Sequence, residues 1–481
     1  MHAEKCLTEL YDWNISSSKL IKKLLLVLKD PLFPMKFLKS GKLPLLNGTS
    51  VSAKKMLKDL IFYLRKYHHV LDFRNDYDLI SAFKHRWLQF STLDRIKDLR
   101  NSGIPIVICG QVFQELIYGS GASTIGSLTP YFLECHLAGK YSYQQKGHEF
   151  CSFESCPGEP VIPILVLEKV IEVDLFINAS HTYMGDVPCL HNLLRGYNIP
   201  LHVIDFPSGS HVKPWAFKYL VEQLKIAVKT MEQFFEKRIT EEDIHRGIKM
   251  INAVRKSYIE YDNIILSTSA PPISSFENSL VQSCIVDMQG DPIALVQAMK
   301  ELNAELKRRV KNKVKAPGVK ENPIRIYAAE KTGYDLTTLN LINDLGAVLI
   351  GPEVCETMYL SGLVDENKNP YEAIAEYYMY KYPWSPTVSI QKRADWFLER
   401  VKQVKAHGVI FTGVWGCQWD PAYRKYLADR VEKKLGIPSL FLEFEDIPYE
   451  FQENGRYKIK EQVRTRIEAF IELIKHRLKT N

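Results

Sequence analysis

Short, continuously apolar runs rich in β-branched residues alternate with helix-like stretches along most of this chain. Because these runs do not alternate between an apolar and a polar face, they predict strands buried on both sides, as in parallel sheets covered by helices. Seven runs have this character, in two groups: 104–108, 173–177 and 201–206, then 324–328, 347–350, 409–412 and 439–444. The sequence therefore predicts an α/β protein with two parallel-sheet domains of the Rossmann-like or flavodoxin-like kind.

Helical periodicity marks the beginning of the chain and the gap between the two groups of strands. Apolar residues recur every three or four positions over 20–28, 53–68 and 76–90, and helix-like stretches fill 213–237, 241–263 and 292–315. Pro317 and Gly318 follow the last of these as helix stop signals. We therefore expect an N-terminal helical cap over 1–95, an α/β domain with a helical connector over 96–318, and a second α/β domain with a C-terminal helix over 319–481.

The net charge of +7 is concentrated at the start of the 481-residue chain. The first 100 residues carry 19 Lys and Arg against 10 Asp and Glu, which suits a nucleic acid, an acidic partner or the phosphates of a ligand. This segment has no zinc-finger, RNP-like or arginine-rich motif, so we expect no nucleic-acid partner. No leader peptide and no membrane-spanning run is visible. We expect a cytoplasmic protein without a membrane association.

Familiar nucleotide and metal motifs are missing from the sequence. No G-x-G-x-x-G follows the first strand of either domain, and neither a G-x-x-x-x-G-K-[S/T] phosphate loop nor an H-E-x-x-H motif occurs. Nine scattered cysteines, an odd number, do not suit a disulfide framework. Cys151 and Cys156 have a spacing that zinc could use, but no second pair follows at a matching distance.

Two cysteines far apart in the sequence have surroundings that suggest a shared role. Cys151 lies in G-H-E-F-C-S-F and Cys417 in G-V-W-G-C-Q-W-D-P, and each follows or neighbours an apolar, strand-like segment. We expect both on loops at the edge of a sheet, where ligands of parallel sheets gather. Two thiolates delivered from separate halves of a chain to one cleft are suited to an iron–sulfur cluster.

Five separated segments together resemble one family, the 2-hydroxyacyl-CoA dehydratases and the related ATP-dependent benzoyl-CoA reductases. The first is I-P-I-V-I-C-G-Q-V-F-Q-E-L at 104–116, similar to the family's opening strand and following helix. The others are E-F-C-S-F at 149–153, 174–207 with its N-I-P-L-H-V-I-D-F-P ending, 409–443 around Cys417, and T-R-I-E-A-F-I-E at 465–472. Their order and the two cysteines extend the resemblance over about 100–481.

The resemblance implies a subunit of an ATP-dependent, iron–sulfur radical 2-hydroxyacyl-CoA dehydratase, a lyase. It implies a [4Fe–4S] cluster with ligands at Cys151, Cys417 and one further position, and it places substrate-binding residues at Gly110, Gln111 and Glu115. It also implies an acyl-CoA substrate, a related partner subunit in a heterodimer, and an iron–sulfur activator ATPase. In this scheme the ATPase injects a low-potential electron through the cluster into the acyl-CoA thioester.

Two departures from the family pattern leave alternatives open. The family's middle cysteine would fall near 183–185, where this chain has none, so the third ligand is Cys189, or His181 or Asp186, or the cluster has been lost. The family's catalytic serine and glutamate correspond to Gly110 and Leu128, and neither side chain can transfer a proton.

The sequence thus allows several functions beside the dehydratase subunit. These are a benzoyl-CoA-type aryl-CoA reductase subunit, a cluster-free structural partner subunit, and a two-domain protein that binds a small molecule without a metal. The acyl group, and the choice between water removal and ring reduction, stay open. Glu115 also suits a structural role as a carboxylate at a helix N-terminus.

Overall fold

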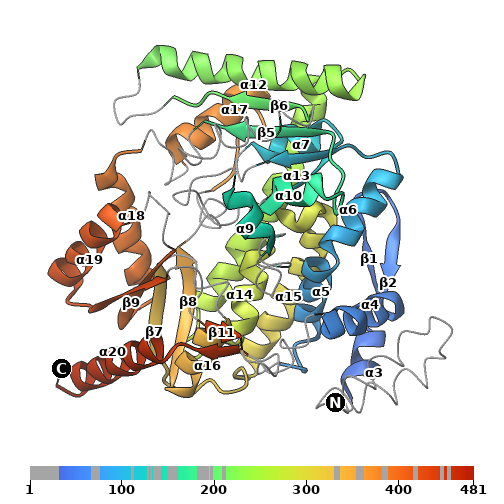
Figure 1. Ribbon diagram of the computed structural model, residues 1–481. Helices are drawn as coiled ribbons and strands as arrows, with labels where there is room; N and C mark the ends of the chain where they lie inside the picture. Colours follow the sequence, from blue (N-terminus) through green and yellow to red (C-terminus); the bar gives the residue numbers. More distant parts are fainter. Residues whose placement is uncertain are drawn as a thin grey trace.

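A computed structural model describes residues 32–66, 76–109, 113–126, 129, 133, 142–149, 161–180, 194, 199–207, 213–285, 287–329, 336–353, 362–381, 388–414, 421–444, 449–451 and 457–480. Over this part of the chain, two four-stranded parallel sheets are joined by long helices that occupy the middle of the molecule (Figure 1). The predicted α/β class with two parallel-sheet domains is confirmed. No helix among the described residues is long and apolar enough to cross a membrane.

The first sheet has the strand order β4-β3-β5-β6, and all its neighbouring strands are parallel. Its strands are β3 (Ile106–Cys109), β4 (Ser123–Ile125), β5 (Leu175–Ala179) and β6 (Leu201–Ile204). The helices that follow in this half are α7 (Gln114–Gly119), α9 (Ser142–His148), α10 (Val161–Leu167) and α12 (Pro214–Phe235). The three strands predicted in this half are confirmed, and β4 is an addition to them.

The second sheet has the order β10-β9-β7-β8 and is also parallel. Its strands, all four predicted, are β7 (Ile324–Ala329), β8 (Ala347–Glu353), β9 (Gly408–Val414) and β10 (Ser439–Phe444). This half also contains α16 (Leu336–Asp344), α17 (Pro370–Glu376), the π-helix η6 (Tyr377–Lys381), α18 (Ile390–Gln403), α19 (Pro421–Leu435), the hairpin β11 (Tyr449–Phe451) and β12 (Tyr457–Ile459), and α20 (Glu461–Thr480).

Between residues 32 and 101, the described elements are four helices and a short antiparallel hairpin. Its elements are α3 (Phe33–Leu38), β1 (Lys42–Pro44), β2 (Ser50–Ser52), α4 (Ala53–Lys66), α5 (Ile80–Phe90) and α6 (Thr92–Asn101). Helices α4 and α5 fall in the ranges predicted to be helical, whereas the helix expected over 20–28 lies outside the described residues. The hairpin was not predicted because each strand has only three residues.

Two long helices, a shorter helix and a 3₁₀ turn lie between the two sheets along the described chain. They are α13 (Glu241–Leu266), α14 (Ser275–Ser283), the 3₁₀ turn η3 (Met288–Gly290) and α15 (Pro292–Lys311). Helix α13 begins at a capping box, because the Asp243 N–H donates to the Thr240 hydroxyl at 3.2 Å and the Thr240 N–H donates to the Asp243 carboxylate at 2.7 Å. This cap satisfies N–H groups that the first helical turn would otherwise leave without partners.

Buried ion pairs attach the N-terminal region to these middle helices. Arg309 on α15 binds both carboxylate oxygens of Asp76, at 2.5 and 3.1 Å. Arg86 on α5 pairs with Glu277 on α14, and both side chains are at most 1% exposed. Lys84 donates to Glu301 at 2.6 Å. Because an isolated buried charge is costly, these pairs hold α5 in a fixed place against α14 and α15.

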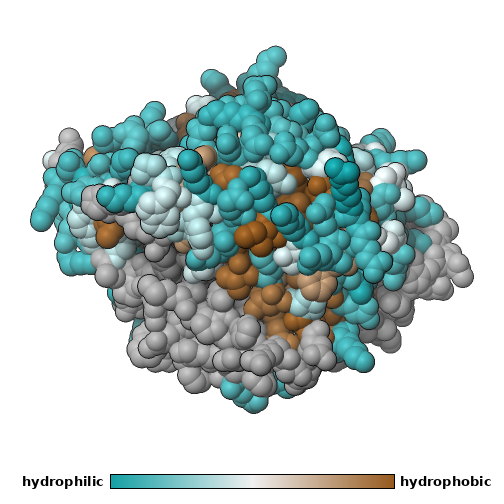
Figure 2. Space-filling view, turned by 90° about the horizontal axis from the view of Figure 1, so that it is seen from above, coloured by the Kyte–Doolittle hydropathy of each residue, from teal (hydrophilic) through white to brown (hydrophobic). Residues whose placement is uncertain are grey.

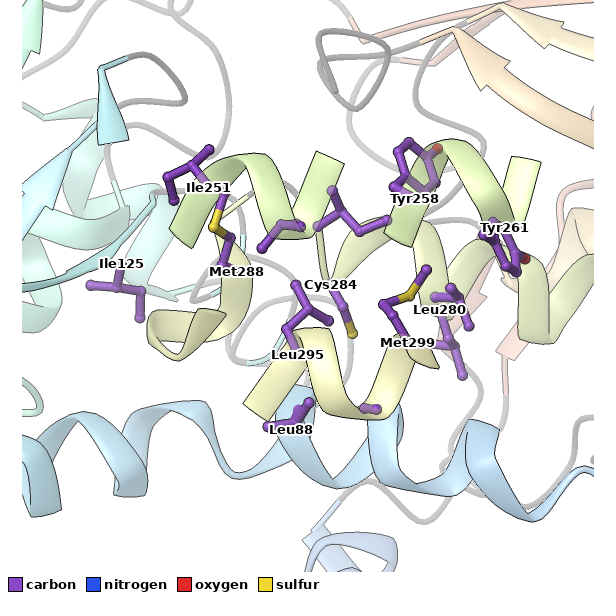
Figure 3. Packing of buried hydrophobic residues seen from close by; sticks show 14 of the residues in the cluster. Leu88, Ile125, Ile251, Tyr258, Tyr261, Leu280, Cys284, Met288, Leu295 and Met299 are labelled. Atoms are coloured by element: carbon purple, nitrogen blue, oxygen red, sulfur yellow. The ribbon is translucent and has the colours of Figure 1, made fainter. Parts of the chain in front are cut away.

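The hydrophobic core continues between the same helices. Figure 3 shows Cys284 among apolar side chains from several helices, including Leu88, Leu295 and Met299. Cys284 is fully buried, and burial raises the pKa of its thiol. This cysteine is therefore a core residue of the middle helices.

Candidate active site

The carboxyl ends of β3, β5 and β9 lead directly into the loops that carry the predicted functional residues. Strand β3 ends at Cys109, one residue before Gly110, and its neighbour β5 ends at Ala179, just before the segment with the alternative cluster ligands. Strand β9 ends at Val414, three residues before Cys417. Carboxyl ends of parallel strands are where α/β proteins bind ligands. In both halves of the chain, the loops with the predicted residues therefore begin at the sheet edge where ligands of α/β proteins bind.

Most of the predicted site residues themselves lie outside the described residues. These are the expected cluster ligands Cys151, Cys189 and Cys417, the alternatives His181 and Asp186, and the substrate-binding candidates Gly110 and Gln111. Their assignment stays a prediction. Among the substrate-binding candidates, Glu115 is the one that the structure describes.

The elements that flank Cys151 differ from the sequence prediction. The described elements on either side are the helices α9 and α10, so the expected neighbouring strand is wrong. The apolar run Val161–Leu167 forms a helix with five buried residues, and Pro163 lies in its first turn, where it interrupts no intrahelical hydrogen bond. Cys417, in contrast, follows a strand as predicted.

The thiols that the structure describes are poor candidates for metal binding. Over the described ranges, no three His, Cys, Asp or Glu side chains are close enough to hold a metal ion. Cys109, at the end of β3, is 3% exposed, and burial, with the nearby Glu115 charge, raises the pKa of its thiol to about 12. A thiol of this kind is protonated at neutral pH and is a weak ligand.

Phe113, the residue directly before α7, is held by aromatic packing. Phe113 has a φ of 62°, which is in the left-handed region and is strained for a residue with a side chain. Its buried ring packs against Tyr378 with a centroid distance of 4.7 Å and against Phe206 at 5.9 Å. Tyr378 belongs to the π-helix of the second half, so Phe113 contacts residues from both halves of the chain.

Glu115, in the first turn of α7, belongs to a buried charged cluster. Its Oε1 accepts a hydrogen bond from Arg255 Nη2 on α13 at 2.6 Å, and its Oε2 accepts one from the Tyr378 hydroxyl at 3.1 Å. Both Glu115 and Arg255 are 0% exposed. Burial acts to lower the pKa of Arg255, but Glu115 and neighbouring tyrosines raise it above its ordinary value. The Arg255 guanidinium also lies 4.3 Å from the ring centroid of Tyr377.

Close backbone packing keeps α7 in place beside this cluster. Gly247 on α13 lies against the Glu115 carbonyl oxygen and the backbone of Gly119, and a Cβ added at Gly247 would overlap both. A side chain at this position would therefore separate the two helices. As a result, the helix after β3 has little freedom to move relative to α13.

A buried carboxylate lies at the carboxyl end of β4. Asp287 is 1% exposed and accepts hydrogen bonds from the backbone N–H of Gly126 at 3.2 Å and of Gln289 at 3.0 Å. Burial raises the pKa of Asp287 to about 6. The next three residues all have positive φ angles, 54° at Met288, 52° at Gln289 and 70° at Gly290. Asp287 therefore precedes a strained turn, and its carboxylate contacts Gly126, the first residue after β4.

Arg255, Tyr378 and Asp287 were not found from the sequence. Arg255 is 140 residues from Glu115, and Tyr378 is 263 residues from it. None of the three lies in a recognisable motif. The signal that could have suggested them is weak: a charged or polar residue within an otherwise apolar helical stretch.

Comparison with known proteins identifies the family. A family model described as 2-hydroxyglutaryl-CoA dehydratase, D-component, matches residues 109–474. The chain belongs to this D-component family. The match runs from the last residue of β3 into α20, and it confirms the resemblance predicted from the sequence.

One curated relative of this D-component family member is the alpha subunit of (R)-2-hydroxyglutaryl-CoA dehydratase from Acidaminococcus fermentans. The two are 24% identical over 250 residues, which is 52% of this chain and 50% of the relative. The chain therefore matches about half the length of that subunit. The N-terminal residues before 109 lie outside the family match.

Proposed function

We propose that this chain is a subunit of an ATP-dependent, iron–sulfur radical 2-hydroxyacyl-CoA dehydratase-type enzyme. The observation that supports this most is the family match over residues 109–474. The relative named as a dehydratase subunit supports the same assignment. The substrate would be an acyl-CoA thioester, and the assembly would include a related companion subunit and an activator ATPase.

The donor set of the chain fits a [4Fe–4S] cluster. Cys151 and Cys417, with Cys189 as the third thiolate, would hold it. When bound, the cluster would supply one low-potential electron to the thioester carbonyl. The framework fits this arrangement because β9 ends three residues before Cys417, and β5 ends shortly before the loop that contains Cys189.

Buried side chains of this chain would control the surroundings of the substrate. Phe113, Phe206 and Tyr378 form a buried group of aromatic rings directly before α7, which would keep water from this side of the substrate. In a dry environment each nearby charge has a larger electrostatic effect on the reacting group. The Glu115–Arg255 pair would fix the start of α7 and thereby the position of the loop with Gln111 that precedes this helix. That loop, and not Glu115, would contact the substrate.

Proton transfer would depend on the companion subunit. The positions that match the family's catalytic serine and glutamate are Gly110 and Leu128, and neither has a group that can donate or accept a proton. The chain would therefore contribute electron delivery and part of the substrate pocket, and the second subunit would contribute the acid–base groups.

A second candidate function is a cluster-free partner subunit. The absence of a cysteine at 183–185 favours it, because one expected thiolate would then be missing. In this case the chain would complete the substrate pocket of a cluster-bearing subunit without redox chemistry of its own.

Iron and acid-labile sulfide analysis of the chain, purified without oxygen, separates the two candidates. We expect about four of each per chain, lost in Cys151→Ala and in Cys417→Ala, whereas Cys189→Ala tests the third ligand. Cys284→Ala is the matched control, because this thiol is buried among apolar side chains of the middle helices. An iron-free protein that still pairs with a related subunit would exclude the redox function and support the cluster-free one.

A further inference from the structure

In the described part of the chain, seven residues other than glycine have positive φ angles. Four of them are exposed and lie within two residues after a helix, where this conformation is common: Lys169, Glu236, Lys313 and Lys405. The other three, Phe113, Met288 and Gln289, are at most 1% exposed. Phe113 follows β3, and Met288 and Gln289 belong to η3, which contacts the neighbouring strand β4. Buried backbone strain is therefore concentrated beside two adjacent strands of the first sheet.

The strained turn η3 places one carboxylate against the segment that follows β4. Asp287 precedes the turn, and its Oδ2 accepts from the Gly126 N–H at 3.2 Å while its Oδ1 accepts from the Gln289 N–H at 3.0 Å. The Gln289 side chain donates to Thr129 Oγ1 at 3.2 Å and to Asp287 Oδ1 at 3.1 Å, and the Thr129 side chain hydrogen-bonds Asp287. Asp287 and Gln289 thus hold Gly126 and Thr129, two residues on either side of position 128 in the sequence.

The polar group around Asp287 is buried without a countercharge. On the face that Figure 2 shows, hydrophilic residues (teal) cover much of the described surface, whereas Asp287 lies inside the protein. Three other buried carboxylates, Glu115, Glu277 and Asp76, each pair with an arginine. Among the described residues no cation pairs with Asp287, and its donors are N–H groups and the Thr129 side chain. A buried carboxylate without a counterion and a strained turn both lower stability, and such breaks of local rules are typical of functional positions.

Gly126 connects this carboxylate with the end of β3. A Cβ at Gly126 would lie 3.2 Å from Asp287 Cβ and 3.8 Å from the Cys109 carbonyl oxygen, so Gly126 lies between the two. Strands β3 and β4 are parallel neighbours, and Cys109 directly precedes Gly110 and Gln111, two of the predicted substrate-binding residues. A displacement of the segment after β4 would therefore reach the backbone that leads into the predicted binding loop.

We propose that Asp287 is a positioning residue of the substrate pocket, which fixes the segment after β4 and, through Gly126, the end of β3 that leads to the predicted binding loop. This inference rests on the proposed function, since it takes that loop to bind the acyl-CoA thioester. The ionised carboxylate accepts the Gly126 and Gln289 N–H groups with one oxygen each. Asn has one acceptor oxygen, so in Asp287→Asn one of these N–H groups would face an NH₂ group and lose its partner. Either loss frees the segment, because Gln289 in turn holds Thr129.

Hydrogen exchange of the full-length chain at pH 7, measured by mass spectrometry, tests the positioning. In Asp287→Asn we expect amides within 106–116 and 123–133 to exchange roughly tenfold faster than in the wild type, which is the factor for about one lost hydrogen bond. The melting temperature should not fall, because the substitution also removes a buried charge. Asp291→Asn is the matched control: Asp291 is equally buried and holds the N–H groups of Leu46 and Ala294, neither of which belongs to the first sheet. It should leave exchange in 106–116 unchanged.

The exchange pattern separates positioning from a general contribution to stability. Faster exchange in both segments, without a lower melting temperature, supports the proposal. Faster exchange confined to 123–133 overturns it, because the end of β3 would then be independent of Asp287. A lower melting temperature with faster exchange in α5 and α20 as well also overturns it, since Asp287 would then only stabilise the fold.

Enzyme kinetics provide a second readout. In enzyme reconstituted with the companion subunit and the activator ATPase, Asp287→Asn should raise KM for (R)-2-hydroxyglutaryl-CoA roughly tenfold and leave kcat within about twofold of the wild type. An unchanged KM would overturn the proposal. A wild-type enzyme without turnover would count against the proposed function alone, because the exchange measurement needs neither substrate nor cluster and still decides whether Asp287 fixes the two segments.

Discussion

Replacing Arg255 with methionine should destabilise the protein more than almost any change on its surface. Met keeps the length and the apolar stem of the side chain but removes the charge that faces Glu115 at 2.6 Å, where both residues are 0% exposed. Breaking a buried pair from one side costs about 3–5 kcal/mol, because the remaining charge is left without its counterion. The Tyr378 hydroxyl still donates to Glu115, so we expect a loss of about 3 kcal/mol in the free energy of unfolding.

Urea unfolding, followed by circular dichroism, measures this loss as a lower midpoint. Arg246→Met is the matched control, since Arg246 is an exposed arginine on the same helix whose pair with Asp243 should contribute less than about 1 kcal/mol. The double variant Glu115→Gln, Arg255→Met removes both charges and should regain at least half of the loss. A loss below about 1 kcal/mol in Arg255→Met, or no recovery in the double variant, would refute the reasoning from the buried charge.

Two further changes test other parts of the framework. Burial raises the pKa of Asp287 from 3.8 to about 6, so the folded protein binds this proton more tightly than the unfolded chain does. The wild type should therefore lose up to about 3 kcal/mol of stability from this group as the pH rises from 4 to 6. Urea unfolding midpoints at pH 4.5 and pH 7 should show this loss in the wild type and not in Asp287→Asn. The same pH dependence in both proteins would contradict the prediction. Gly247→Ala should lower the free energy of unfolding by about 3 kcal/mol or more, because the added methyl group overlaps the backbone of α7. The control Lys249→Ala, on the exposed side of α13, should melt within about 1 °C of the wild type. Equal melting temperatures for the two variants would exclude the close contact.

The two sheets could be predicted because seven of their strands are mostly apolar runs of four to seven residues. Each of the seven predicted runs is a strand in the structure. Strand β4 escaped prediction because it has three residues, two of which are polar, and no periodicity can be read from so short a segment. Its Ser123 is buried all the same, because the hydroxyl donates to the Gly290 carbonyl oxygen at 2.7 Å. That partner is 167 residues away, and local sequence patterns contain no information about it.

Only part of the candidate site could likewise be predicted from the sequence. The loops with Cys151 and Cys417 could be singled out from the residues around them, since those residues resemble a family pattern. The cluster around Glu115 could not, because its members come from α7, α13 and η6 and are brought together by the fold alone. Long-range pairs of this kind follow from packing, which a single sequence does not display.

The buried pairs of the N-terminal region also determine the order of events during synthesis. Glu277, the partner of Arg86, is 191 residues later in the chain, and Glu301, the partner of Lys84, is 217 residues later. At a translation rate of about 5–20 residues per second, about 10–40 s pass before these partners leave the ribosome. Until then, Arg86 and Lys84 lack these two carboxylates, so the ion pairs that hold α5 against α14 and α15 cannot form. The final placement of α5 is therefore completed only after residue 301 has been synthesised, and a slow codon run before residue 277 would lengthen this interval.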